Sequence, residues 1–256
     1  ELVEYTSLEL PALASFVHAA LIRALDGAEK PGGVPAPELD RPSRAFNPTS
    51  VVSRAAVCAF TECSSIPKWT RLFASAEEGA SFSAMCSAVI GYDGPTLFAF
   101  RDEDGRWLGA LSTSVFKEDV AFCKGDGALL MFSPCFAALR KRSSGHMVKD
   151  HAQFLCIRSR TLPHGVGWGG PSVEQTRLWI NDELDQCRAS GYDETYVPGN
   201  LRPGAETESF AVTDFEVWGL GGDAAVRARD EAKRTTERIV QHQRKARCSH
   251  DADLDL

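Results

Sequence analysis

The sequence is 256 residues long, with 43% hydrophobic and 25% charged residues and a formal net charge of -7 at pH 7. This composition is typical of an ordinary globular protein that buries a full apolar core without disulfide or metal staples. The acidic balance argues against a general nucleic-acid binder, because contacts to phosphate groups need a basic surface. Any basic surface for a partner must therefore be local.

The first predicted element is an N-terminal helix within residues 1–26, where apolar residues recur at helical spacing from position 8 to position 25. Residues 27–48 are rich in proline and glycine, which predicts a linker or a long surface loop. Asn47-Pro48 offers the start of a second helix that ends before Pro67. We therefore expect the main domain to begin near residue 49.

After Pro67 the sequence changes to short β-rich runs that are separated by turn signals. Six strands are predicted, at residues 96–100, 107–112, 128–132, 154–157, 177–180 and 210–218. The sequence Asp102-Glu103-Asp104-Gly105 predicts a hairpin between two of them. Because no long helices intervene, the pattern favours an α+β fold built on a mainly antiparallel two-sheet β-sandwich with flanking helices.

The segment 223–248 predicts a C-terminal basic helix, since residues 223–247 lack Pro and Gly and are rich in Ala, Arg, Glu and Lys. Eight basic against four acidic residues give this stretch a charge of +4, which leaves -11 for the rest of the -7 chain. Large aliphatic residues are few, so we expect the helix to gain little from packing back and to act as an arm for a partner. The candidate contacts are Arg227, Arg229, Lys233, Arg234 and Arg238. A solvated terminal helix is the alternative, and residues 249–256 predict a disordered acidic tail.

Motifs for enzyme chemistry are weak. Gly79-Ala80-Ser81-Phe82-Ser83 fails as a nucleophile elbow because Ser83 stands where a glycine is required. The run Gly165–Gly170 has the glycine density of a phosphate loop, but no Lys-Ser/Thr pair follows, and a tight turn with close backbone packing explains it better. The acidic cluster at 182–185 is interpreted as a solvated turn. We expect no catalytic residues.

The eight cysteines contain no C-x-x-C pair and lack the spacing of a metal or disulfide module, which indicates reduced thiols and a cytoplasmic protein. No cofactor and no metal site is expected. Cys187 has no basic or histidine neighbour in the sequence that would depress its pKa, so thiol chemistry is not predicted. No apolar run approaches the roughly 18 residues that a membrane span requires.

In combination, five blocks of the chain resemble the TLDc domain family. In order they are 67–75 with 79–83, 94–97 with 104–110, 127–132, 161–170 with 178–180, and 215–219. Glu78 stands where the family usually has histidine, and Asp193 stands where it usually has cysteine. The glycine-rich block and the charged helix after Glu216-Val217-Trp218-Gly219 look most like the lysosome-associated, MTOR-linked branch.

The resemblance implies a TLDc domain over residues 49–222, folded as a sandwich of two antiparallel sheets. It also implies a non-enzymatic protein that binds and regulates a vacuolar proton-pumping ATPase (V-ATPase) through a sandwich face and the C-terminal helix. Such a protein works in the cytoplasm, at the surface of the lysosome or vacuole. A structural part in a cytoskeletal or ciliary assembly with tubulin is the alternative, and protection against oxidation, which the family's name suggests, is the third.

The five tryptophans differ in their predicted burial. Trp69, Trp107, Trp179 and Trp218 lie in or beside apolar strands and are predicted core aromatics. Trp168 lies between glycines in a predicted loop, where burial is less assured. It is therefore the candidate exposed anchor for a partner.

Overall fold

The computed structural model describes residues 37–45, 57, 68–119, 121–133, 136–142, 151–231 and 234. The predicted N-terminal helix, most of the predicted second helix, Lys233, Arg238 and the acidic tail lie outside these residues. Among the described residues, none belongs to a helix with the length and apolar character needed to cross a membrane.

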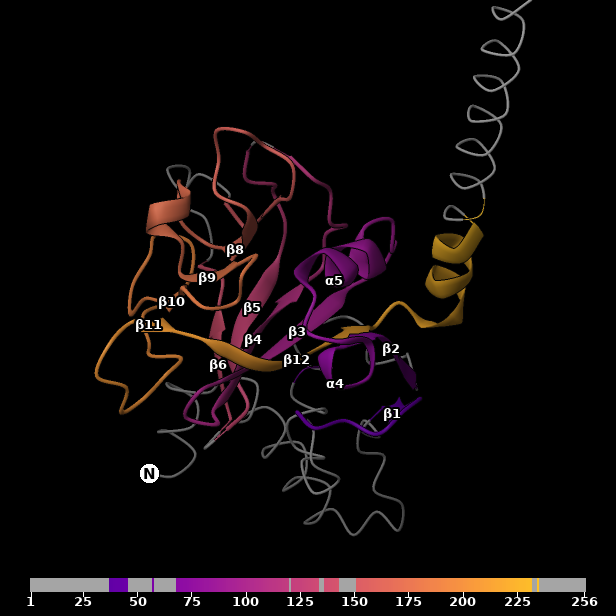
Figure 1. The fold of residues 1–256 in the computed structure, drawn as a ribbon, viewed down its shortest axis with the longest axis horizontal. Coiled ribbons are helices and arrows are strands. Elements are labelled where there is room, and N and C mark those ends of the chain that lie inside the picture. The colour runs from indigo at the N-terminus through magenta and orange to yellow at the C-terminus, as the bar shows by residue number, and fades with distance from the viewer. Residues whose placement is uncertain are drawn as a thin grey trace, which may run out of the picture.

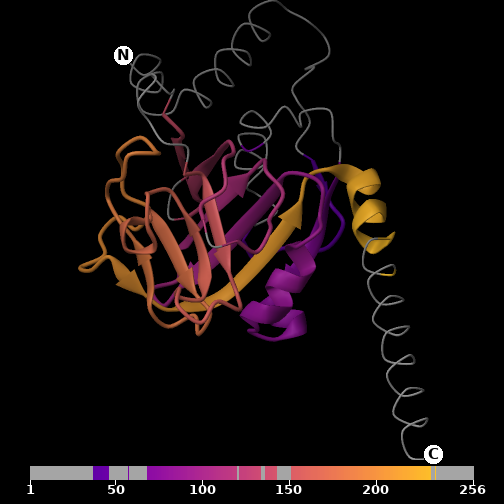
Figure 2. The same ribbon diagram turned by 90° about the horizontal axis from the view of Figure 1, so that it is seen from above.

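Two sheets form the fold, as predicted (Figures 1 and 2). The larger sheet has the order β1-β2-β12-β3-β4-β5-β6, and the smaller has the order β11-β10-β9-β8-β7. The larger contains β1 Glu38–Leu39, β2 Lys68–Ala74, β3 Thr96–Asp102, β4 Trp107–Ser112, β5 Gly127–Met131, β6 Ala137–Arg140 and β12 Val212–Gly219. The smaller contains β7 Gln153–Cys156, β8 Gly165–Trp168, β9 Leu178–Asn181, β10 Cys187–Ala189 and β11 Ser209–Phe210. All these pairs are antiparallel except the parallel pair of β1 with β2.

The described helices are short. They are α4 Ser75–Glu78, α5 Phe82–Val89, the 3-10 turn η2 Val173–Gln175, and a C-terminal helix that begins at 222 and is described to 231. The Ser81 hydroxyl caps α5 by accepting from the Ala84 amide at 3.2 Å. Phe82, Met85 and Val89 then bury one face of α5 in the core.

Five of the six predicted strands are confirmed with small shifts at their ends, and the hairpin between β3 and β4 is confirmed as well. The strand predicted over 210–218 is divided between the sheets, because Phe210 belongs to β11 of the small sheet and β12 of the large sheet begins at Val212. Strands β3 and β4 are buried on both faces, which explains why their sequences are continuously apolar instead of alternating. The inner face of the large sheet packs on the small sheet through Phe98 and Phe100, while the outer face carries a second cluster around Leu97 and Trp218. The core therefore lies on both sides of the large sheet.

The interpretation of residues 165–170 as a turn is wrong for its first part, because 165–168 form β8 inside the small sheet. The glycines let the Trp179 ring lie against this strand. A Cβ on Gly165 would lie 2.4 Å from the Trp179 ring, and a Cβ on Gly167 would lie 2.9 Å from it. Only Gly169 and Gly170, with φ of +75° and +77°, make the turn that was expected.

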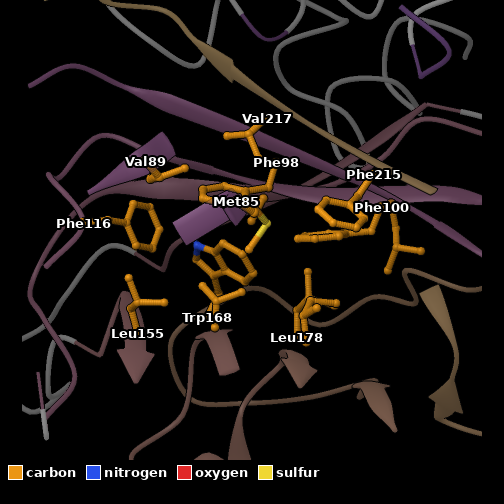
Figure 3. Close-up of a cluster of buried hydrophobic side chains, with 14 of the residues drawn as sticks. Met85, Val89, Phe98, Phe100, Phe116, Leu155, Trp168, Leu178, Phe215 and Val217 are labelled. Carbon is orange, nitrogen blue, oxygen red and sulfur yellow. The ribbon is translucent and has the colours of Figure 1, made fainter. Parts of the chain in front are cut away.

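The expectation that Trp168 is exposed is also wrong, since its side chain is 0% exposed. Its ring lies between the sheets, with centroids 5.1 Å from Phe98 and 6.2 Å from Phe116 (Figure 3). Its Nε1 donates to Ser112 Oγ at 2.8 Å. The other four tryptophans are buried as predicted. Trp168 is therefore a core residue and not a surface anchor.

Candidate partner-binding site

The C-terminal helix leaves the domain directly after β12 (Figure 1). Its first turn is fixed to the domain, because Ala225 is 6% exposed within the main core and Val226 packs against that core. Just before it, the Gly221 amide donates to Tyr92 Oη at 2.7 Å. The expectation that this helix gains little from packing back therefore does not hold for its first turn.

Beyond this turn the helix presents basic side chains. Arg227 and Arg234 are exposed, and their separation of seven residues is two helical turns, so they share one face. Arg229 differs, because it is partly buried and pairs with Asp230 at 2.8 Å. Of the five predicted contact residues, Arg227 and Arg234 thus lie on one exposed face of the helix. Arg229 is instead engaged in an ion pair with its neighbour Asp230.

A buried ionic cluster joins the two sheets, and sequence reasoning missed it. Arg202, whose side chain is 3% exposed, donates from Nε to Asp102 at 2.9 Å and from Nη1 to the Ser209 carbonyl at 2.9 Å. Its Nη2 lies 3.3 Å from Glu103. No sequence signal could connect Asp102 with Arg202, since they lie 100 positions apart. The cluster fixes the β3–β4 hairpin to the loop before β11.

A pocket of about 190 Å³ lies beside this cluster. Its lining includes Arg202, Glu206 and Glu208. Four of the five N–H groups of Arg202 already donate to protein acceptors, and its charge faces the carboxylates of Asp102, Glu103 and Asp104. The pocket is therefore poorly suited to an anion. In the described part of the chain, no group of three or more His, Cys, Asp or Glu is placed to hold a metal ion.

Asp193 stands where the TLDc family, which this chain resembles, usually has cysteine, and it has a structural role. Its carboxylate is buried and accepts from the Thr195 amide at 2.7 Å and the Tyr196 amide at 3.2 Å. It also faces Arg177 at 3.7 Å, and burial lowers the pKa of the Arg177 guanidinium despite this partner. Asp193 thus closes the loop after β10 by accepting two backbone hydrogen bonds. A cysteine thiol, whose sulfur is a weak acceptor, could not replace these bonds.

Three of the described thiols are poor nucleophiles. Burial raises the pKa of both Cys86 and Cys187 to about 12, and it also raises the pKa of the less buried Cys123. A raised pKa keeps these thiols protonated at neutral pH. Because the thiolate is the reactive form, they react slowly.

We therefore expect Cys187→Ser to leave any protection against peroxide unchanged. Iodoacetamide should label Cys187 at least about a hundredfold more slowly in the folded chain than in urea, because the buried thiol is protonated. Peptide mass spectrometry measures both rates. Loss of protection in Cys187→Ser would bring the thiol-enzyme interpretation back.

His164 connects the loop before β8 to the turn after β9. Its Nε2 lies 2.7 Å from the Ser159 carbonyl and its Nδ1 lies 3.3 Å from Asp182 Oδ2. The carbonyl first and the carboxylate second raise the pKa of His164, and Glu118 acts in the same direction. Both nitrogens therefore face acceptors, which suits the imidazolium form.

Asp182→Asn should lower the pKa of His164, as measured by NMR titration of the ring protons. A folded-state pKa above the unfolded value means that the contact stabilises the protein below about pH 6.5, and that this contribution disappears as the pH rises through the raised pKa. Asp185→Asn is the matched control, since Asp185 accepts from Asn181 instead. An unchanged His164 titration in Asp182→Asn contradicts this account.

Comparison with known proteins places these features in a family. The family model for the TLDc domain matches residues 50–221, which is more than half of the chain. MTOR-associated protein MEAK7 from Xenopus laevis is 30% identical over 60% of this chain, and its human counterpart is 28% identical over the same share. Oxidation resistance protein 1 from Xenopus tropicalis is 28% identical over 59% of the chain.

The matched region spans 32% of the length of these MEAK7 relatives and 16% of the oxidation resistance protein. The likeness is therefore to one domain of longer proteins. The two-sheet sandwich is the fold that the resemblance implied. On the match of residues 50–221, the chain belongs to the TLDc domain family.

Proposed function

We propose that this chain is a non-enzymatic TLDc module that binds and regulates the cytosolic part of a vacuolar proton-pumping ATPase. The observation that supports this most is the anchored basic helix. Its first turn is packed into the core at Ala225, while Arg227 and Arg234 point a basic face to solvent. The sandwich and the helix thus form two connected binding surfaces.

An anchored helix suits regulation of a rotary pump. The pump changes shape during its cycle, and a partner that binds one state better than another shifts the equilibrium toward that state without any chemistry. The name of the MEAK7 relatives, MTOR-associated protein, says that they associate with another protein, and this supports a protein-binding role for the present chain. We place that role in the cytoplasm, at the surface of the lysosome or vacuole, as the location of the proposed partner.

Charge directs the helix to an acidic partner surface. The stretch 223–247 carries +4 in a chain of -7, so the basic charge is concentrated in the helix while the rest of the chain is acidic. Exposed ion pairs contribute only about 0 to 1 kcal/mol each, so several arginines must act together. Binding should also weaken as salt rises.

We expect the double variant Arg227→Glu, Arg234→Glu to bind V-ATPase cytosolic subunits roughly tenfold more weakly, because reversal removes two attractions and adds two repulsions. A pull-down from native extract with a dilution series measures the effect. A chain that ends at residue 222 should lose the helix contribution completely.

The control reverses two exposed arginines far from the helix, Arg101→Glu and Arg158→Glu, which changes the net charge equally. This control should bind like the parent. If the helix variant binds as well as the parent, the helix is not part of the partner-binding surface. Capture of tubulin in place of pump subunits supports the cytoskeletal alternative, and peroxide turnover by the pure chain supports the third.

A further inference from the structure

Residues 37–45, here called the strap, lie in the segment expected to be a linker or surface loop. Two of them form β1, which pairs with β2 at the edge of the large sheet (Figure 1). The Asp40 amide donates to the Trp69 carbonyl at 3.1 Å, and the Arg71 amide donates to Asp40 Oδ1 at 2.8 Å. Leu39 and Ala45 pack against the outer cluster. The strap therefore covers one edge of the domain.

Two buried carboxylates of β12 hold the second half of the strap. Glu216, which is 2% exposed, accepts from Ser43 Oγ at 2.6 Å and from the Arg44 amide at 2.7 Å. Asp214, which is 5% exposed, pairs with the Arg44 guanidinium at 3.0 Å and accepts from Ser75 Oγ at 2.5 Å. Residues i and i+2 of a strand share a face, so both carboxylates meet the strap together.

Ser43 lies between two basic side chains. Arg41 and Arg44 have side chains that are 60% and 66% exposed, and the backbone from Pro42 to Arg44 is outside any helix or strand. Protein kinases select substrates by such charge patterns around the acceptor hydroxyl, and they bind that hydroxyl in an irregular, extended segment. The chemistry of this segment fits a kinase with an acidic substrate cleft.

We propose that Ser43 is a phosphorylation site and that its phosphorylation releases the strap from Asp214 and Glu216. A kinase of arginine-directed specificity transfers the γ-phosphoryl group of ATP to Ser43 Oγ. The bond from the γ-phosphorus to the bridging oxygen breaks, the bond to Oγ forms, ADP leaves, and the hydroxyl proton passes to the kinase base. The kinase and ATP are the co-reactants that the cell supplies.

The consequence follows from charge and geometry. The phosphate adds roughly -1.5 to -2 charge and removes the proton that Ser43 donates. It would stand beside the Glu216 carboxylate, which is almost fully buried and so is screened little by water or salt. Arg41 and Arg44 offer the opposite charge, but both side chains are mostly exposed and already paired, with Glu77 and Asp214. Repulsion therefore exceeds attraction.

Release changes the surface that the domain offers. Without β1, the backbone groups of β2 become an open sheet edge, which pairs readily with an extended segment of another chain. The outer cluster around Trp218 loses the cover of Leu39 and Ala45. Phosphorylation of Ser43 thus converts a closed edge into one that accepts a strand.

Hydrogen exchange of the full chain tests the release step. In Ser43→Glu, the amides of Asp40 and Arg44 should exchange at least about tenfold faster than in the parent, because the new charge faces a buried carboxylate. Ser43→Ala, which loses one hydrogen bond without adding charge, should change them far less. Exchange at Gly109, in the middle of β4, shows whether the domain remains folded.

A charge-rescue variant separates release from misfolding. Adding Glu216→Gln to Ser43→Glu removes the repulsion and should restore slow exchange at Arg44. The modification itself is tested by incubating the full chain with an arginine-directed kinase and ATP and mapping phosphate by mass spectrometry. Absence of phosphate on Ser43, no rescue, or slow strap exchange in the phosphorylated chain each overturns the proposal.

Discussion

Trp168→Ala should lower the free energy of unfolding by about 3 to 5 kcal/mol, the range for deleting a large buried aromatic side chain. The ring is fully buried where the two sheets meet, against Phe98, Phe100 and Phe116 (Figure 3). Its loss leaves a cavity between two rigid sheets that cannot close around it, and it also removes the donor for Ser112. Denaturant unfolding followed by circular dichroism measures the change.

Tyr192→Ala is the matched control, because Tyr192 is 60% exposed and its truncation should change stability by at most about 0.5 kcal/mol. Trp179→Ala should fall between the two. Trp179 belongs to a small third cluster with Phe154 and Cys156, and its ring also lies against the glycines of β8. If Trp168→Ala unfolds at the same denaturant concentration as the parent, the packing between the sheets is not as described.

Arg202→Ala should be nearly as damaging, with a loss of about 3 to 5 kcal/mol, because it leaves a buried carboxylate without its main cation. Asp102 is 1% exposed, and Arg202 also donates to the backbone carbonyls of Thr207 and Ser209, the latter the first residue of β11. Arg106 still donates to Asp102, so the loss is expected toward the lower end.

A double variant distinguishes the ion pair from simple packing. Adding Asp102→Asn to Arg202→Ala removes the stranded charge and should recover part of the lost stability. Arg158→Ala, with a side chain that is 86% exposed, serves as the control and should be near neutral. If the double variant loses more free energy of unfolding than the two single variants lose together, the assignment of an unfavourable buried charge is contradicted.

The sequence predicted those parts of the fold in which local pattern and burial agree. Strands β3 and β4 carry long apolar runs, β12 alternates apolar residues with Asp214 and Glu216, and the hairpin at Asp104-Gly105 has a turn signal of its own. Strand β8 was missed because its glycines serve the ring of Trp179, a contact made across to β9 and invisible in local sequence. Strands β6 and β10, of four and three residues, are too short to show a period.

The candidate sites show the same division. A basic terminal helix is visible in composition, but the turn that leads into it packs Gly221 against Tyr92 and Gly94, more than a hundred positions earlier. The contact of Ser43 with Glu216 likewise joins positions 173 apart. Such contacts arise from topology, and no local pattern of residue types encodes them.

Strand order has a final consequence for biosynthesis. Strand β12, the last strand in the sequence, lies between β2 and β3, which are among the first. The large sheet therefore cannot close until residues 212–219 have left the ribosome. Until then the edges of β2 and β3 are open, and pairing at such long sequence separation is slow. A chain stalled or cut before residue 212 should thus depend on chaperones, whereas one cut after the sheet is complete should fold.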